Sequence, residues 1–173
     1  MILLYILIGL MALIILLSLI APKSYEVFRK IKIDRPVDDV FSYLRMLKNQ
    51  DDWSPWALKD PNMAKAYEGI DGTPGFVSKW EGNKEVGSGE QEIKSIIENK
   101  RIDSELRFLK PWKSTSDAYM IVTPSGEGTE VKWGFAGKNK FPMNIMLLFM
   151  SMDKMIGKDF EQGLERLKIK LEN

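Results

Sequence analysis

Few residue types in this chain could act in catalysis or bind a metal, because it contains no histidine and no cysteine. Without them no Ser-His-Asp triad, thiol nucleophile, disulfide or ordinary zinc site can form. The acidic residues do not follow the D-x-D-x-D spacing of a calcium loop, so we expect no metal site and no cofactor. Any catalysis would have to use Asp, Glu, Tyr, Lys or Arg as a general acid or base.

The charged residues give no catalytic candidate of their own. Glu90, Glu92 and Arg107 alternate away from the predicted core, so we expect them in solvent and assign no catalytic residue. The chain has a net charge of +1, and its charges of both signs are well mixed. The composition therefore gives no basic surface for nucleic acid.

Two tryptophans are the first candidates for ligand contact. The segment NQDDWSPWALKDPN places Trp53 and Trp56 among acids, amides and prolines. Tryptophan is among the least favourable residues to leave in water. The two rings must therefore cover either the core beneath a loop or a bound ligand, and the sequence leaves both readings open.

The first 21 residues form a separate element that would hold the chain at a membrane. Residues 1–21 carry no charged side chain, and about 20 apolar residues at ~1.5 Å rise span roughly 30 Å, the thickness of the hydrocarbon core. A cleaved signal peptide would need a basic start, a shorter apolar run and an A-x-A-like site. We therefore expect a single-pass transmembrane anchor. The Lys and Arg residues that follow it predict a cytoplasmic globular part.

Residues 24–173 read as one α+β domain. Alternation predicts a strand over Ser24–Ile33, and Pro36 opens a short helix with an apolar stripe. A second short helix is expected over Met46–Trp53, ending before Pro55.

Six further strands are predicted between residues 63 and 138. Their inward residues are expected to be Phe76, Ser78, Trp80, Ile93, Ile97, Ile102, Ser104, Leu106, Phe108, Val131, Trp133 and Phe135. A helix should then run from Phe141–Pro142 to the end. Its first part, FPMNIMLLFM, is apolar on every side, so it would be either buried or in contact with lipid.

This order of elements resembles the helix-grip fold of the START-like (SRPBCC) superfamily, in which a curved seven-stranded antiparallel sheet wraps a long C-terminal helix. The blocks WSPWALKDP, WEGNKEVGSGEQEI, LRFLKPWKS, GTEVKWGFAGK and MDKMIGKDFEQGLERLK are similar to bacterial polyketide cyclase/dehydrase-type members. The resemblance implies an internal cavity for a hydrophobic small molecule or lipid. The residues expected to line it are Trp53, Trp56, Phe76, Trp80, Leu106, Phe108, Trp133, Phe135, Met146 and Met150.

Three functions remain open at this point. The first is membrane-tethered binding of a hydrophobic small molecule or lipid. The second is a cyclase/dehydrase-type enzyme, which requires a carboxylate or tyrosine pointing into the cavity. The third is a protein-interaction module like the chaperone activators of the superfamily, which predicts a solid core and an exposed apolar patch.

Overall fold

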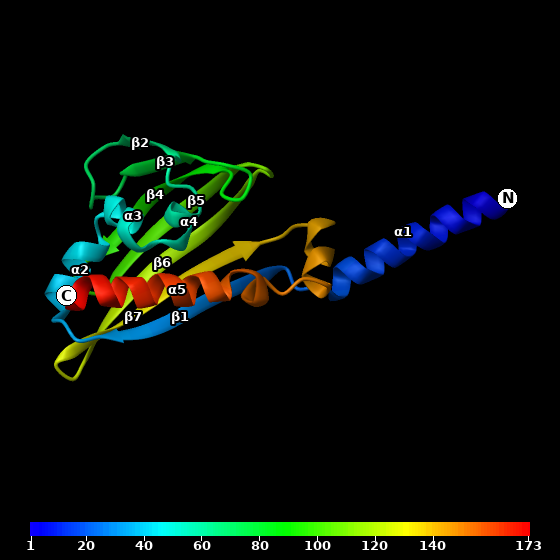
Figure 1. Cartoon of the computed structure of the whole chain (residues 1–173). Coiled ribbons are helices and arrows are strands. Elements are labelled where there is room, and N and C mark those ends of the chain that lie inside the picture. Colours follow the sequence, from blue (N-terminus) through cyan, green and yellow to red (C-terminus); the bar gives the residue numbers. More distant parts are fainter.

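An antiparallel sheet of seven strands curves around the C-terminal helix in the computed structural model, which describes Met1–Asn173 (Figure 1). The strand order is β1-β7-β6-β5-β4-β3-β2, so the first and last strands are neighbours. The strands are β1 (Ser24–Ile33), β2 (Ala64–Glu68), β3 (Val77–Glu81), β4 (Ser88–Ile97), β5 (Arg101–Lys110), β6 (Ser114–Ser125) and β7 (Gly128–Lys138). The α+β helix-grip fold expected from the sequence is confirmed.

Short helices follow β1, in more pieces than the sequence suggested. The predicted helix that Pro36 opens is α2 (Val37–Leu44). The second predicted helix is divided into a 3₁₀ turn, η1 (Leu47–Asn49), and α3 (Gln50–Trp53), and a further helix, α4 (Pro55–Lys59), follows. Ser54 is extended, with φ −65° and ψ 128°, and Pro55 starts the new helix because the first turn has no need of its missing N–H.

A bulge in β4 changes which of its side chains face the core. The pairing register with β5 shifts between Ile93 and Ser95. Ile93 is fully buried, whereas Ile97 is 52% exposed. The prediction that Ile93 and Ile97 share a face is therefore wrong, because the extra residue of a bulge reverses the alternation beyond it. Ile96 packs against the core instead.

The long helix α5 (Met152–Glu172) lies across the concave face of the sheet and starts later than predicted. Ser151 is extended, and its hydroxyl accepts a hydrogen bond from the Lys154 N–H, as a helix N-cap does. The preceding apolar residues form a separate 3₁₀ helix, η2 (Met143–Leu148). A single helix from Phe141 onward is therefore wrong, and the cap at Ser151 is the local reason.

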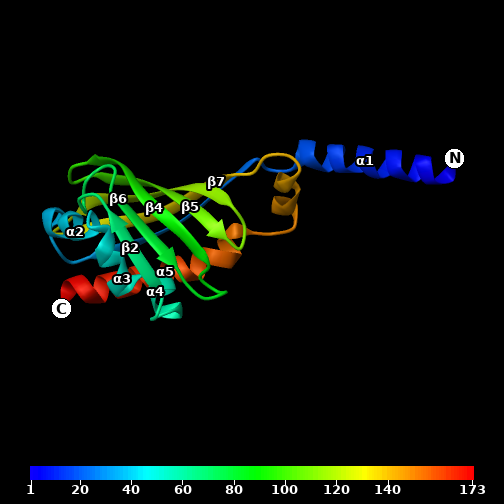
Figure 2. The same cartoon turned by 90° about the horizontal axis from the view of Figure 1, so that it is seen from above.

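The N-terminal helix α1 (Ile2–Ile20) projects away from the domain (Figures 1 and 2). It is long and apolar enough to cross a membrane, a test that a membrane anchor and a signal sequence near the N-terminus both pass. Ser18 is its one buried residue. The Ser18 hydroxyl donates to Asn144 Oδ1 at 2.9 Å, and Asn144 Nδ2 donates to the Ser18 carbonyl at 2.8 Å. This pair joins the end of α1 to η2.

Candidate functional site

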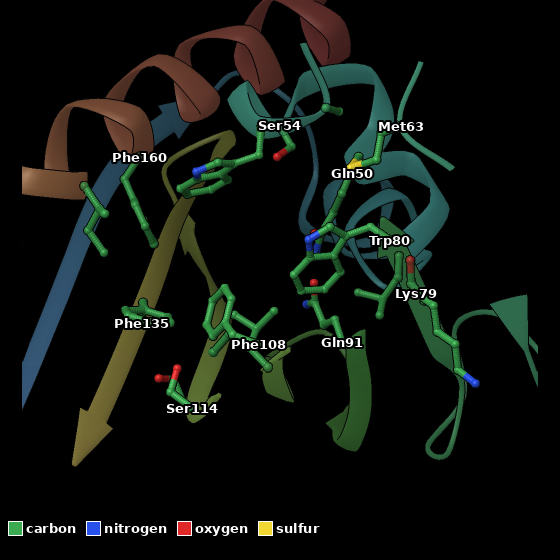
Figure 3. Close-up of a pocket in the computed structure, with 18 of the residues that line it drawn as sticks. Gln50, Ser54, Met63, Lys79, Trp80, Gln91, Phe108, Ser114, Phe135 and Phe160 are labelled. Carbon is green, nitrogen blue, oxygen red and sulfur yellow. The ribbon is translucent and has the colours of Figure 1, made fainter. Parts of the chain in front are cut away.

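A cavity of about 510 Å³ lies between the concave face of the sheet, α5 and the α3–α4 segment (Figure 3). Its size is within the range of about 300–1,000 Å³ that is usual for small-molecule pockets. Sixteen of its 27 lining residues are hydrophobic. Figure 3 shows Phe108, Phe135 and Phe160 on one side and Trp80 with Gln50 and Gln91 on the other, all turned toward the same space.

Small side chains on the concave face leave the room that makes this cavity. One row across the sheet joins β3, β4, β5, β6, β7 and β1 and consists of Ser78, Gln91, Leu106, Ser116, Gly137 and Tyr25. A neighbouring row pairs Trp80 with Gly89, Gly89 with Phe108, and Phe108 with Ser114. Large residues at the serine positions would fill the space between sheet and helix.

The two glycines in these rows lie beneath aromatic rings and not beneath open volume. A Cβ on Gly89 would lie 2.6 Å from the Trp80 ring, and a Cβ on Gly137 would meet the ring of Tyr25. Each ring therefore occupies space next to the backbone that a side chain at the glycine would need. This arrangement sets Trp80 and Tyr25 against the sheet as walls of the cavity.

An aromatic cluster closes the side of the cavity next to α5. Trp56 meets Trp133 edge-on at a centroid distance of 5.7 Å and Phe160 at 5.8 Å. Trp133 and Phe160 are 4.2 Å apart. Gly163 lets α5 approach, since a Cβ there would lie 2.7 Å from the Trp133 ring. Trp56 therefore lines the cavity and packs on α5 at the same time.

The structure places six of the ten residues expected from the sequence on the cavity wall. They are Trp56, Trp80, Leu106, Phe108, Trp133 and Phe135. Contact of these side chains with a ligand stays a prediction.

The other four are not on the wall. Trp53 and Phe76 are each 1% exposed and belong to the solid core. Trp53 lies behind Trp133, edge-on at 4.8 Å. Met146 and Met150 are 45% and 39% exposed on the far side of the break that precedes α5. They were expected on the wall as methionines of one continuous final helix, since methionine suits a pocket for varied apolar shapes.

Several polar wall residues were missed by the sequence reasoning. Gln50 and Gln91 face the cavity and have no side-chain hydrogen bond within the protein. Gln91 is two residues before the buried Ile93, so strand alternation already placed it on the inner face. It pairs with Ser78 on one side and Leu106 on the other, both of which were predicted to face inward. Gln50 had no comparable signal.

The charged residues beside the cavity are already paired. Lys65 Nζ lies 2.7 Å from Asp51 Oδ1, and the Tyr67 hydroxyl donates to Asp51 Oδ2 at 3.0 Å. Burial, followed by this bond, raises the pKa of Tyr67 to about 12. The Lys79 ammonium points away from the cavity (Figure 3) and pairs with Glu68. The cavity is therefore apolar with neutral polar groups.

The cluster of Glu90, Glu92 and Arg107 is separate from the cavity, as expected from alternation. Arg107 Nε lies 2.6 Å from Glu90 Oε1, and its Nη1 lies 2.7 Å from Glu92 Oε2. Hydrogen bonds to these carboxylates raise the pKa of Arg107. No group of three or more His, Cys, Asp or Glu side chains is arranged to hold a metal ion.

The mouth of the cavity lies at the end of the sheet that faces α1. Most of its exposed lining residues come from the β5–β6 hairpin and the start of α5, namely Lys110, Pro111, Trp112, Ser114 and Met155; Lys65 on β2 is exposed as well. The Trp112 side chain is 81% exposed. Both views show this hairpin at the end of the sheet nearest η2 and α1 (Figures 1 and 2).

Several solved structures share this fold at low sequence identity. The Aha1 dimer from Colwellia psychrerythraea has a TM-score of 0.60 at 14% identity, covering 86% of this chain and 96% of that chain. Ara h 8.0201 has a TM-score of 0.56 at 13% identity, covering 86% and 95%. An uncharacterised protein from Rhizobium leguminosarum has a TM-score of 0.62 at 13% identity, covering 87% and 95%.

No curated protein matches the sequence significantly. One family model, described as polyketide cyclase / dehydrase and lipid transport, matches residues 25–172, which is nearly the whole chain after α1. This match agrees with the curved sheet, the long final helix and the cavity between them. The chain is therefore a member of the polyketide cyclase/dehydrase and lipid transport family, and the resemblance seen in the sequence is confirmed.

Proposed function

We propose that this protein binds a hydrophobic small molecule or a single-chain lipid in its cavity while α1 holds it in a membrane. The observation that carries the proposal is the apolar cavity of about 510 Å³. The family's description includes lipid transport, which supports hydrophobic-ligand binding in general.

The volume of the cavity indicates the size of the ligand. At roughly 30 Å³ for each water-sized group, 510 Å³ holds about 17 such groups. That number corresponds to one fatty acyl chain or a small polycyclic molecule rather than a two-chain phospholipid. Gln50 and Gln91 supply amide groups for a carbonyl, carboxylate or hydroxyl at one end of such a ligand.

Binding is better supported than catalysis. An enzyme needs a carboxylate or tyrosine free to exchange a proton with the ligand. Asp51 and Tyr25 do reach the cavity wall. However, Asp51 is engaged by Lys65 and Tyr67, and the Tyr25 hydroxyl lies 3.5 Å from Ser116 Oγ. Neither group stands unpaired beside the open volume.

A protein-interaction module is also less well supported. That function predicts a domain packed solid between sheet and helix, with an apolar patch outside. An exposed apolar patch is present around η2. The volume between sheet and α5 is open, however, and its lining is mostly apolar.

Retention of α1 as an anchor is supported by its contact with the domain. A signal sequence is removed from the mature protein. The end of α1 is instead packed against η2, where Ser18 is 8% exposed and Asn144 1% exposed. Cleavage after Ala21 would leave the buried Asn144 amide without its partners, which is unfavourable.

Quenching of tryptophan fluorescence by a brominated fatty acid tests the proposal in the full chain. All five tryptophans lie after α1, at positions 53, 56, 80, 112 and 133. The chain is reconstituted in phosphatidylcholine vesicles as the Trp112→Phe variant, so that the exposed ring at the cavity mouth does not contribute. Bromine on a bound acyl chain should then quench Trp56, Trp80 and Trp133.

The control uses the same amount of bromine on a phospholipid, which is too large for the cavity. Saturable quenching by the brominated fatty acid beyond that of the brominated phospholipid supports the proposal. Equal quenching by both reagents would contradict it.

A further inference from the structure

The residues between β7 and α5 form an apolar surface that the domain leaves uncovered. Residues 141–150, here called the 141–150 segment, contain no charged side chain. Phe141 is 61% exposed, Met143 57%, Met146 45% and Phe149 78%. A contiguous group of large apolar side chains on the outside of a protein marks contact with another molecule or with a membrane.

The 141–150 segment is fixed to the end of α1 by a specific pair of hydrogen bonds. In an α-helix the Ser18 carbonyl would accept from the N–H of residue 22, but that residue is Pro22, which has none. Asn144 Nδ2 donates to this carbonyl at 2.8 Å, and the Ser18 hydroxyl donates to Asn144 Oδ1 at 2.9 Å. Asn144 therefore completes the end of α1, where an unpaired carbonyl in an apolar medium would be most unfavourable.

Lysines flank this surface along the chain, and the segments that carry them contain no acidic residue. Lys23, Lys110, Lys113, Lys138 and Lys140 are all exposed and lie on three of the four segments at this end of the sheet; the fourth, the β3–β4 hairpin, carries Glu81 and Glu85. Residues 21–25, 109–116 and 137–152 contain no Asp or Glu. Of the five lysines, Lys110 alone has a carboxylate partner, Glu81. Apolar side chains edged by cations are typical of a surface that sits at the headgroup level of a bilayer.

We infer that the 141–150 segment inserts into the lipid surface beside α1 and holds the mouth of the cavity against the bilayer, so that the cavity takes its ligand from the membrane. The part of this inference that concerns the ligand rests on the proposed function. The part that concerns insertion into the membrane rests on the contact between α1 and η2. The bilayer is the occupant because the surface continues directly from a helix that is apolar along its whole length.

The mouth of the cavity is next to this surface in both the chain and the fold. Met155, which lines the mouth, is 53% exposed and follows the segment by five residues. Trp112 and Leu109 on the β5–β6 hairpin are 81% and 48% exposed. Tryptophan is enriched at membrane interfaces because its ring is apolar and its N–H is polar. An acyl chain leaving the bilayer here would meet apolar side chains of the mouth, among them Trp112 and Met155.

Insertion is tested by labels at single cysteines in the full chain, which has none of its own. Phe149→Cys and, as control, Ile169→Cys each carry an environment-sensitive dye. Ile169 is an equally apolar residue, 60% exposed, near the end of α5 that points away from α1 (Figure 1). In vesicles with spin-labelled phospholipid, the label at 149 should be blue-shifted and quenched, and the label at 169 should resemble dye in water. Equal, water-like signals would overturn the insertion.

Loading from the bilayer is tested by the rate at which a brominated fatty acid moves from vesicles to the cavity. Phe149→Glu should slow this transfer about tenfold, because a charge replaces a ring at the lipid surface, and should leave the final quenching unchanged. Ile169→Glu should change neither. An unchanged rate in Phe149→Glu would overturn the loading route alone. Both rates are measured in the Trp112→Phe chain, as in the test of the proposed function. No quenching in that chain without a further substitution would overturn the proposed function and the loading route together, while the labels still decide insertion.

Discussion

Ala118→Leu is the most direct test of the cavity by substitution, because Ala118 is a small residue on the cavity wall. It is 6% exposed on β6, and it pairs with Ser104 on one side and Phe135 on the other. Leucine adds three carbon atoms in the direction of the open volume. At roughly 30 Å³ each, they would fill about 90 Å³ of the 510 Å³ that is present.

Filling an empty apolar space should stabilise the protein. Three buried carbons contribute about 2.4 kcal/mol at ~0.8 kcal/mol each, and ordering the leucine side chain offsets about 0.5–1 kcal/mol of that. We expect a net gain of about 1.5 kcal/mol, or about 3–6 °C in Tm for a chain of this size. Thermal unfolding of the ligand-free chain in vesicles, followed by tryptophan fluorescence, measures this shift.

The same substitution should weaken binding in a way that depends on ligand length. A fatty acid of about 16 carbons fills the cavity, so losing room for three carbons should weaken its binding about 50-fold. A fatty acid of about ten carbons still fits in the remaining volume and should bind as before. Titration of the two acids against both chains gives the comparison.

Ala136→Leu is the matched control. Ala136 is on the neighbouring strand β7 and alternates to the outer face, opposite Glu26 and Asp117. This variant adds the same three carbons on the outer face of the sheet, so Tm should change little and the affinity for both fatty acids should not change. If Ala118→Leu destabilises the protein by about 1–3 kcal/mol, as overpacking of a full core does, and leaves both affinities unchanged, the cavity is not where we place it.

Three further predictions follow from single contacts. Gly137→Ala should lower Tm by the equivalent of about 1–3 kcal/mol, because the new Cβ meets the Tyr25 ring; an unchanged Tm would mean that the ring moves freely. Hydrogen bonding to Lys170 lowers the pKa of Asp52 in the folded protein. The contribution of Asp52 to the stability of the fold is therefore fully present above the unfolded pKa of about 3.9, and it is lost as the pH falls through the folded pKa. Asp52→Asn should therefore destabilise the protein by under about 1 kcal/mol at pH 7 and not at all in strong acid. If urea titrations give the same difference in unfolding free energy between the variant and the unaltered chain at every pH, this prediction is refuted. Asp51→Asn should alter ligand affinity less than about twofold, since the carboxylate is held by Lys65; a loss of tenfold or more would show that Asp51 contacts the ligand.

The sequence was a good guide wherever one regular element sets the direction of its side chains. Strand alternation in β3, β5 and β7 placed Trp80, Phe108 and Trp133 on the inner face, and the structure has them on the cavity wall. The resemblance to a family then supplied what alternation cannot, namely that the inner face encloses an open volume. Period-two alternation gives the face of a strand but not what lies opposite it.

Errors arose where an irregularity interrupts an element. The bulge in β4 exchanges the inward-facing and outward-facing positions after Ile93, and neither Lys94 nor Ser95 is a residue type that predicts a bulge. The break at Ser151 had a visible signal, since serine is a preferred N-cap, but the apolar run before it and Met152 after it read as one continuous helix. Met146 was therefore expected in the cavity and is instead beside α1, with Asn144 as the buried link.

The identity of residues that touch a bound acyl chain tests the central claim most directly. A fatty acid with a photoreactive group near the end of its chain is added to the full chain in phosphatidylcholine vesicles, and the cross-linked residues are found by mass spectrometry of peptides. The account predicts labelling of cavity residues such as Leu106, Phe108 and Ile156, reduced by an excess of unlabelled fatty acid. Labelling confined to α1 and the 141–150 segment, with no competition, would contradict it.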